Sequence, residues 1–115
     1  MVHQLGSSSY WQETSRHVPG PVLRGSHDVD VAIVGGGFTG LWTAYHLRRA
    51  DPSLRVAVIE REMIGFGASG RNGGWCSALL PMGLDAMARE SNHSQAARMQ
   101  AVMHETVGEV GRVVA

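Results

Sequence analysis

Three glycines are spaced as Gly35-x-Gly37-x-x-Gly40, the pattern of loops that hold the pyrophosphate of a dinucleotide. There is a physical reason for glycine at each of the three positions. Gly35 would let the chain turn sharply out of a strand, and Gly37 has no Cβ to keep a pyrophosphate away from the backbone. Gly40 would let the following helix pack closely on the strand, with its N-terminal amides and positive dipole end facing the phosphates. The pattern predicts a dinucleotide-binding turn.

An acidic residue follows at the distance that such a turn requires. Glu60 lies about 20 residues after Gly40, directly after an apolar run. A carboxylate there can accept hydrogen bonds from ribose hydroxyls and would repel a 2′-phosphate. The combination does not separate NAD from FAD, and a glycine-rich turn that binds nothing is the simpler alternative.

A second glycine-rich segment occupies residues 65–74 and offers polar groups as well as close backbone approach. Ser69 and Asn72 can form hydrogen bonds, and Arg71 carries a fixed charge for a pyrophosphate or for the electron-rich edge of a flavin. Because it follows a predicted strand, we expect it near the carboxyl edge of the sheet, where ligands bind. A surface loop with an incidental arginine is the alternative.

The elements that would position these residues form a strand–helix–strand unit. Residues 29–34 are apolar and β-branched and end at glycines, which predicts a buried strand of the parallel type. A helical pattern follows the glycines and stops at Asp51-Pro52, and residues 54–59 predict a second strand. The predicted fold class is α/β: a Rossmann-like βαβ unit that is the incomplete start of a parallel-sheet dinucleotide-binding domain.

Two further regions flank this unit. Residues 1–27 are polar and rich in turn residues, which predicts an extended N-terminal arm that the Tyr10-Trp11 pair could pin to a folded body. Residues 28–115 would form the partial Rossmann domain. From about Leu84 the pattern is helical, with an amphipathic stripe of apolar residues at Met99, Met103, Val107, Val110 and Val114.

Composition excludes several classes of partner. The chain has 115 residues, 43% of them hydrophobic, and no net charge with neutral histidines, so no nucleic-acid or membrane partner is indicated. A single cysteine, Cys76, cannot form an internal disulfide, and the six histidines lack the spacing of metal ligands. No secretory signal or membrane span is recognisable, so we expect a cytoplasmic protein without a bound metal.

The two glycine-rich motifs at this separation resemble a known family. Residues 29–61 and the run from Gly65 to Trp75 resemble FAD-dependent amine and amino-acid oxidoreductases of the D-amino-acid oxidase and glycine oxidase superfamily, most closely its gamma-glutamylputrescine oxidoreductase-like group. The arm around Tyr10-Trp11 and the end of the last helix look like that group too. The resemblance covers nearly the whole chain but only the beginning of a family member.

What the resemblance implies is specific to numbered residues. The FAD pyrophosphate would be wrapped by Gly35, Gly37, Phe38, Thr39 and Gly40. Glu60 would hold the adenosine ribose, with Arg61 beside the adenine. The pyrophosphate, the ribityl chain and the approach to the flavin ring would be lined by Ser69, Gly70, Arg71, Asn72, Gly73 and Gly74. We expect non-covalent FAD, because this second loop contains no histidine.

The implied activity is oxidation of a C–N bond in a small primary or secondary amine or amino acid, by hydride transfer to the flavin. The catalytic residues would lie beyond Ala115, so the chain alone is expected to be inactive. Two alternatives stay open. One is another flavoprotein class, such as a monooxygenase or an RNA-modifying enzyme, and the other is a NAD-binding Rossmann protein.

Overall fold

The structure is a computed structural model that describes residues 9–14 and 20–115. Residues 1–8 and 15–19, part of the predicted arm, lie outside the described residues. The chain divides into two compact units, residues 1–73 and 74–115. The elements in chain order are α1 (Tyr10–Thr14), β1 (Val31–Val34), α2 (Phe38–Ala50), β2 (Val56–Ile59), the 3-10 turn η1 (Ala68–Gly70), α3 (Leu84–Glu90) and α4 (His93–Val114).

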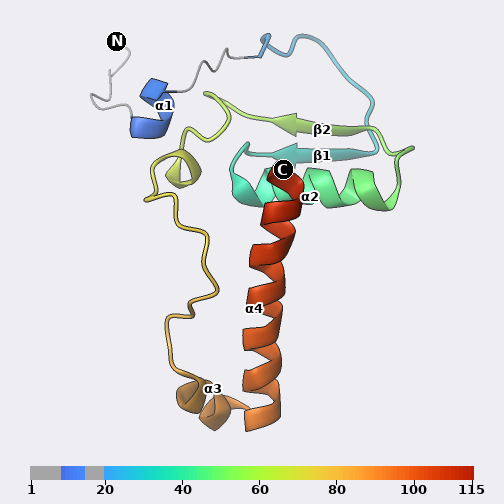
Figure 1. The fold of residues 1–115 in the computed structure, drawn as a ribbon. Coiled ribbons are helices and arrows are strands. Elements are labelled where there is room, and N and C mark those ends of the chain that lie inside the picture. Colours follow the sequence, from blue (N-terminus) through green and yellow to red (C-terminus); the bar gives the residue numbers. More distant parts are fainter. Residues whose placement is uncertain (1–8, 15–19) are drawn as a thin grey trace. The chain divides into compact units, whose positions relative to one another are not determined.

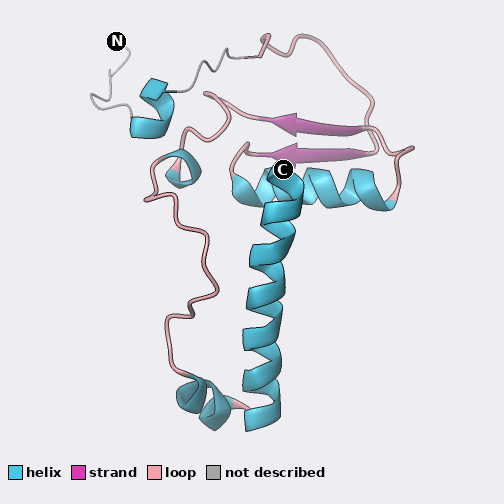
Figure 2. Ribbon diagram, viewed as in Figure 1, coloured by secondary structure: helices cyan, strands magenta, loops and turns pink. Residues whose placement is uncertain are grey.

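The first unit is built around a βαβ motif. β1 and β2 pair in parallel, with Val31 opposite Val56 and Val34 opposite Ile59. α2 connects the two strands and lies along one face of the sheet (Figures 1 and 2). The α/β fold and the Rossmann-like unit predicted from the sequence are therefore confirmed. Each strand begins two residues later than the sequence pattern predicted.

An ion pair ties together the entrances to the two strands. Asp30 accepts hydrogen bonds from the backbone N–H of Arg55 at 2.8 Å and from its guanidinium Nη2 at 2.9 Å. The Arg55 side chain and backbone together lower the pKa of Asp30 to about 2. Asp30 therefore remains ionised at neutral pH and helps to set the register of the strands.

The strands are less buried than their composition predicted. Val34 is 87% exposed and Ile59 is 38% exposed, so the prediction of fully buried strands is wrong for both residues. A parallel sheet buries both faces only where helices cover both. In the part of the chain that the structure describes, α2 packs against one face of β1 and β2.

Local chemistry sets the ends of α2. Gly37 precedes its first turn in an extended conformation, and Asp51 follows its last. Beyond that end, the guanidinium Nη1 of Arg48 donates to the carbonyl oxygens of Pro52 and Leu54, the second at 2.7 Å. These hydrogen bonds hold the loop between α2 and β2 against the end of α2.

The N-terminal region contains a helix that the sequence analysis did not predict. Residues 10–14 of the predicted extended arm form α1. Ser9 and Gln12 build a reciprocal cap: the backbone N–H of Gln12 donates to the Ser9 hydroxyl at 3.3 Å, and the Gln12 side-chain oxygen accepts from the Ser9 backbone N–H at 3.2 Å. This capping box explains why so short a segment is helical.

The second unit consists of α3, α4 and the segment before them. The predicted continuous helix is interrupted between α3 and α4, because Asn92 caps α4 by accepting a hydrogen bond from the backbone N–H of Gln95 at 2.9 Å. Met103, Val107 and Val110 of the predicted stripe are half-buried. Among the described residues, no helix has both the length and the apolar character needed to cross a membrane.

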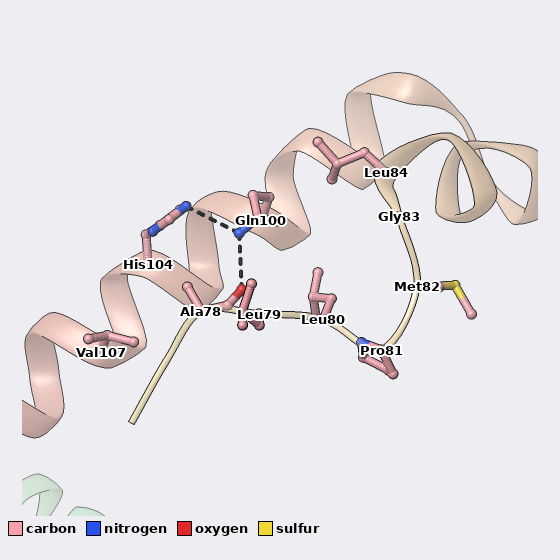
Figure 3. Close-up of a pocket in the computed structure, with 10 residues that line it drawn as sticks. All are labelled: Ala78, Leu79, Leu80, Pro81, Met82, Gly83, Leu84, Gln100, His104 and Val107. Carbon is pink, nitrogen blue, oxygen red and sulfur yellow. Dashed lines mark hydrogen bonds between the residues drawn. The ribbon is translucent and has the colours of Figure 1, made fainter. Parts of the chain in front are cut away.

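Figure 3 shows a pocket in this second unit, between residues 78–84 and α4. The Gln100 amide nitrogen donates to the carbonyl oxygen of Ala78 at 3.1 Å and lies 3.1 Å from His104 Nε2. The remaining wall is mostly apolar, with leucines from residues 79–84. None of the lining residues belongs to the predicted cofactor-binding set, whose residues 35–73 lie in the first unit.

Candidate cofactor-binding site

The first glycine-rich loop makes the sharp turn that its sequence predicted. Gly35 has φ +105°, a conformation that residues with a Cβ rarely adopt, and its N–H donates to the carbonyl oxygen of Ile59 at 2.8 Å. A Cβ on Gly40 would lie 2.1 Å from the carbonyl oxygen of Gly35. Both positions therefore require glycine, one for its backbone angle and the other for close packing.

The start of α2 presents backbone N–H groups. The Phe38 amide donates to the Ser69 hydroxyl at 2.9 Å, and the Leu41 amide donates to the carbonyl oxygen of Gly37 at 3.0 Å. No acceptor in residues 9–14 or 20–115 pairs with the amides of Gly37, Thr39 and Gly40. Amides at the first turn of a 13-residue helix suit an anionic ligand, because the dipole adds to their own polarity.

Glu60 is attached to this loop. One carboxylate oxygen accepts from the Gly36 amide at 2.8 Å, and the other accepts from the Glu62 amide at 3.0 Å. Hydrogen bonds from the amides of Glu62 and Gly36 lower the pKa of the Glu60 carboxyl. A half-buried carboxylate is thus held anionic at the end of β2. Its neighbour Arg61 is exposed and pairs with Glu62 at 3.0 Å.

The second glycine-rich loop repeats the spacing of the first, as Gly65-x-Gly67-x-x-Gly70. Gly65 has φ +73°, and a Cβ on Gly70 would lie 2.1 Å from the carbonyl oxygen of Gly65. The amide of Gly65 donates to the carbonyl oxygen of Gly36 at 2.9 Å. With the bond between Ser69 and Phe38, this contact brings the two predicted loops together.

The later residues of the second loop bond within the loop. The Arg71 guanidinium lies over the Phe66 ring, 4.9 Å from its centroid, and its Nε donates to the Phe66 carbonyl oxygen at 2.9 Å. The side-chain Nδ2 of Asn72 donates to the Ser69 carbonyl oxygen at 2.7 Å. Gly73 ends the first unit and Gly74 begins the second, so the structure does not place Gly74 beside the first loop.

Sequence reasoning missed most of the contacts made by the N-terminal helix. The indole Nε1 of Trp11 donates to the carbonyl oxygen of Asn72 at 2.8 Å. The prediction that the Tyr10-Trp11 pair could pin the arm is thus confirmed for Trp11. The feature that allowed the prediction was a pair of large aromatic residues in an otherwise polar segment. It did not indicate that Trp11 would bind the second glycine-rich loop.

Comparison with known families identifies the chain. The family described as FAD dependent oxidoreductase matches residues 30–113, a range that contains both loops and both strands. The chain belongs to this family. Because the family is FAD-dependent, FAD is favoured over NAD as the dinucleotide for the paired loops.

Individual relatives agree with this assignment. Gamma-glutamylputrescine oxidoreductase of Escherichia coli (strain K12) is 38% identical over 99 residues, covering 86% of this chain and 23% of the relative. Sarcosine oxidase subunit beta of Rhizobium meliloti (strain 1021) is 54% identical over 43 residues, covering 37% and 10%. Mitochondrial L-2-hydroxyglutarate dehydrogenase of Nematostella vectensis is 42% identical over 62 residues, covering 53% and 14%. No solved structure matches the chain.

This chain spans about a quarter or less of the length of these relatives. The names of the first two refer to an amine and an N-methylated amino acid, whereas the third names a hydroxy acid. Relatives with different named substrates therefore match parts of this chain.

Proposed function

We propose that this chain supplies the pyrophosphate- and adenosine-binding part of the FAD site in an oxidoreductase that oxidises the C–N bond of an amine or amino acid. The observation that carries the proposal is the hydrogen bond between Phe38 N–H and Ser69 Oγ at 2.9 Å. It holds the second glycine-rich loop at the N-terminus of α2, where unpaired amides suit a diphosphate.

The residues present fit a dinucleotide. The amides of Gly37, Thr39 and Gly40 would donate to the pyrophosphate, and the Ser69 hydroxyl would add a donor from the second loop. Gly35 and Gly67 leave open space where a Cβ would stand, so the backbone is accessible at both loops. In this proposal Gly70, Arg71, Asn72 and Gly73 continue the wall toward the flavin, and Gly74 stays a prediction from the sequence alone.

Glu60 and Arg61 would recognise the adenosine. Each carboxylate oxygen of Glu60 accepts one hydrogen bond from a backbone amide. Each oxygen therefore keeps a lone pair that can accept from a ribose hydroxyl. The exposed Arg61 guanidinium would lie beside the adenine, where a planar cation can stack. A bound flavin would accept the hydride from the carbon next to the substrate nitrogen.

The choice of an amine substrate is supported by two relatives, the gamma-glutamylputrescine oxidoreductase and the sarcosine oxidase subunit. The relative named for a hydroxy acid supplies the competing substrate class. Non-covalent attachment of FAD is proposed because the Ser69–Gly74 segment contains neither histidine nor cysteine as an attachment point.

The test begins with the protein purified from its complete reading frame. We expect a yellow protein with the two absorption bands of oxidised flavin, and flavin that is released into the supernatant when the protein is denatured. A colourless protein that takes up NAD but not FAD contradicts the proposal. Flavin that precipitates with the denatured protein contradicts the non-covalent attachment but not the binding of FAD.

Substrate class is tested separately under anaerobic conditions. Polyamine derivatives, N-methylated amino acids and L-2-hydroxy acids are each mixed with the oxidised protein, and bleaching of the flavin bands is followed. We expect bleaching by members of the first two groups. Bleaching only by hydroxy acids would retain the FAD site and overturn the amine assignment.

A further inference from the structure

The short helix α1 and the residue before it contact the second glycine-rich loop through side-chain donors. Three side chains from one helical turn each donate to a different main-chain carbonyl oxygen of this loop. The pairs are Ser9 Oγ with Gly70, Trp11 Nε1 with Asn72 at 2.8 Å, and Gln12 Nε2 with Phe66 at 3.3 Å. The acceptors span residues 66–72. The side chains of this helical turn therefore bind the loop before η1, at the end of η1 and after it.

These contacts are directional rather than a matter of apolar burial. Trp11 is 44% exposed, and it is the polar N–H edge of its indole that meets the loop. Its ring packs edge-to-face against Tyr10, with centroids 5.2 Å apart, which restricts the rotamers of Trp11. The capping box between Ser9 and Gln12 fixes the helical turn from which all three donors project.

The loop that α1 holds also carries the contact to α2. Ser69 lies between Phe66 and Asn72, and its hydroxyl accepts from the Phe38 amide at 2.9 Å. The Asn72 side chain, next to the carbonyl that Trp11 binds, donates to the Ser69 carbonyl oxygen at 2.7 Å. A continuous path of hydrogen bonds therefore leads from α1 through the loop to the first turn of α2.

We propose that Trp11 and Gln12 are positioning residues for the FAD site, because they hold the loop of residues 66–72 against the N-terminus of α2. This inference rests on the proposed function for its effect on FAD, but not for the contact itself. Holding a loop in its binding geometry before the ligand arrives reduces the entropy lost on binding. Affinity differences among variants of one site lie mostly in the dissociation rate, so loss of the contact should speed the release of FAD.

A double substitution removes the two side-chain N–H donors and keeps the helix. Trp11→Phe keeps an aromatic ring against Tyr10, and Gln12→Glu keeps a side-chain oxygen for the capping box. The matched control is Tyr10→Phe, which removes the hydroxyl of a side chain that is 68% exposed. All variants are made in the complete protein and loaded with FAD.

Two readouts test the proposal. We expect FAD dissociation to be roughly tenfold to twentyfold faster in the double variant, at about threefold to fivefold for each lost hydrogen bond, and unchanged in Tyr10→Phe. In the protein without FAD, we expect faster amide hydrogen exchange in residues 65–73 of the double variant and at the Phe38 amide that donates to Ser69, with the rest of α2 exchanging as before. A purely structural role would instead lower the thermal midpoint and accelerate exchange in α2 as well.

The outcomes separate this inference from the proposed function. An unmodified protein that binds no FAD overturns the proposed function, while the exchange experiment still tests the contact. Unchanged exchange in residues 65–73 overturns the inference. Faster exchange with an unchanged FAD dissociation rate shows a contact without a positioning role, and this result also overturns it.

Discussion

The two glycine-rich loops have the same glycine spacing and the same local turn but different structures beyond it. Each opens with a glycine of positive φ, at Gly35 and Gly65. Each closes with a glycine whose Cβ would lie 2.1 Å from the carbonyl oxygen of the first, at Gly40 and Gly70. Gly40 is the third residue of the 13-residue helix α2, which continues to Ala50, whereas Gly70 is the last residue of the three-residue turn η1.

The residues after the last glycine explain the difference. Gly40 is followed by apolar residues at helical spacings, Leu41, Ala44 and Leu47, and the helix that they help to form packs on both strands. Gly70 is followed by Arg-Asn-Gly-Gly, which offers no such face. The same glycine pattern therefore yields a helix N-terminus with unpaired amides in one place. In the other it yields an irregular loop that needs contacts with α1 and α2.

The largest expected effect comes from Gly40→Ala. Alanine favours a helix by up to about 1 kcal/mol over glycine, but its Cβ would meet the backbone carbonyl of Gly35, which cannot move without opening the turn. Overpacking of this kind costs roughly 3 kcal/mol, so we expect a net loss of about 2 kcal/mol in urea unfolding. An unfolding midpoint equal to that of the unmodified protein would falsify the close packing at the first loop.

Gly70→Ala introduces the same clash at the second loop, so its loss of stability can be compared directly with that of Gly40→Ala. Because η1 is short, its neighbours can shift, so we expect a smaller loss of stability, about 1 kcal/mol. FAD affinity should still fall about tenfold, since Ser69 would move away from Phe38. Gly67→Ala is the control for the unfolding measurement, because its Cβ would meet nothing within 4 Å of the protein. Equal losses of stability in Gly40→Ala and Gly70→Ala would remove the distinction between the loops.

Ser69→Ala breaks the contact between the loops without a steric change. The Phe38 amide would lose its acceptor, which costs about 1 kcal/mol in stability at most. We expect FAD affinity to fall about fivefold by titration. Ser77→Ala, in the second unit, is the control. An affinity for FAD that does not change would show that the second loop contributes no side chain to the site.

Glu60→Gln is expected to have the smallest effect on stability at neutral pH. The side-chain oxygen of the glutamine can still accept the hydrogen bond from the Gly36 amide. The folded-state pKa of Glu60 is lowered by the amides of Glu62 and Gly36. Its contribution to stability is therefore present above the unfolded value of about 4.3 and is lost as pH falls through the lowered pKa.

The unfolding midpoint as a function of pH checks this prediction. The unmodified protein should lose stability below about pH 4.3, and Glu60→Gln should lose less in that range. The decline that remains should include Asp30, whose pKa is about 2. Glu90→Gln is the control at an exposed end of α3. Identical pH profiles for the unmodified protein and Glu60→Gln would contradict a bonded, anionic Glu60.

Much of the βαβ unit could be predicted because its signals are local. Glycine spacing, β-branched runs and the Asp51-Pro52 stop each act within a few residues. The strand starts were placed two residues too early, because Val29 and Leu54 are apolar, whereas the Arg55 N–H donates to the Asp30 side chain and not to a backbone carbonyl. The break before α4 was missed although Asn92 is a good N-cap, because the helical pattern that begins at about Leu84 continues past it.

The sequence by itself determined the two turns, the helix between the strands and the acid after β2, since glycine angles and helical periodicity are properties of short segments. Only the tertiary structure decided that Glu60 binds the Gly36 amide, that Ser69 meets Phe38, and that Trp11 reaches the loop of residues 66–72. These pairs are separated by 24 to 61 residues in the chain. No local pattern specifies which distant carbonyl or amide a donor will meet, because that depends on how the turns and strands place the segments in space.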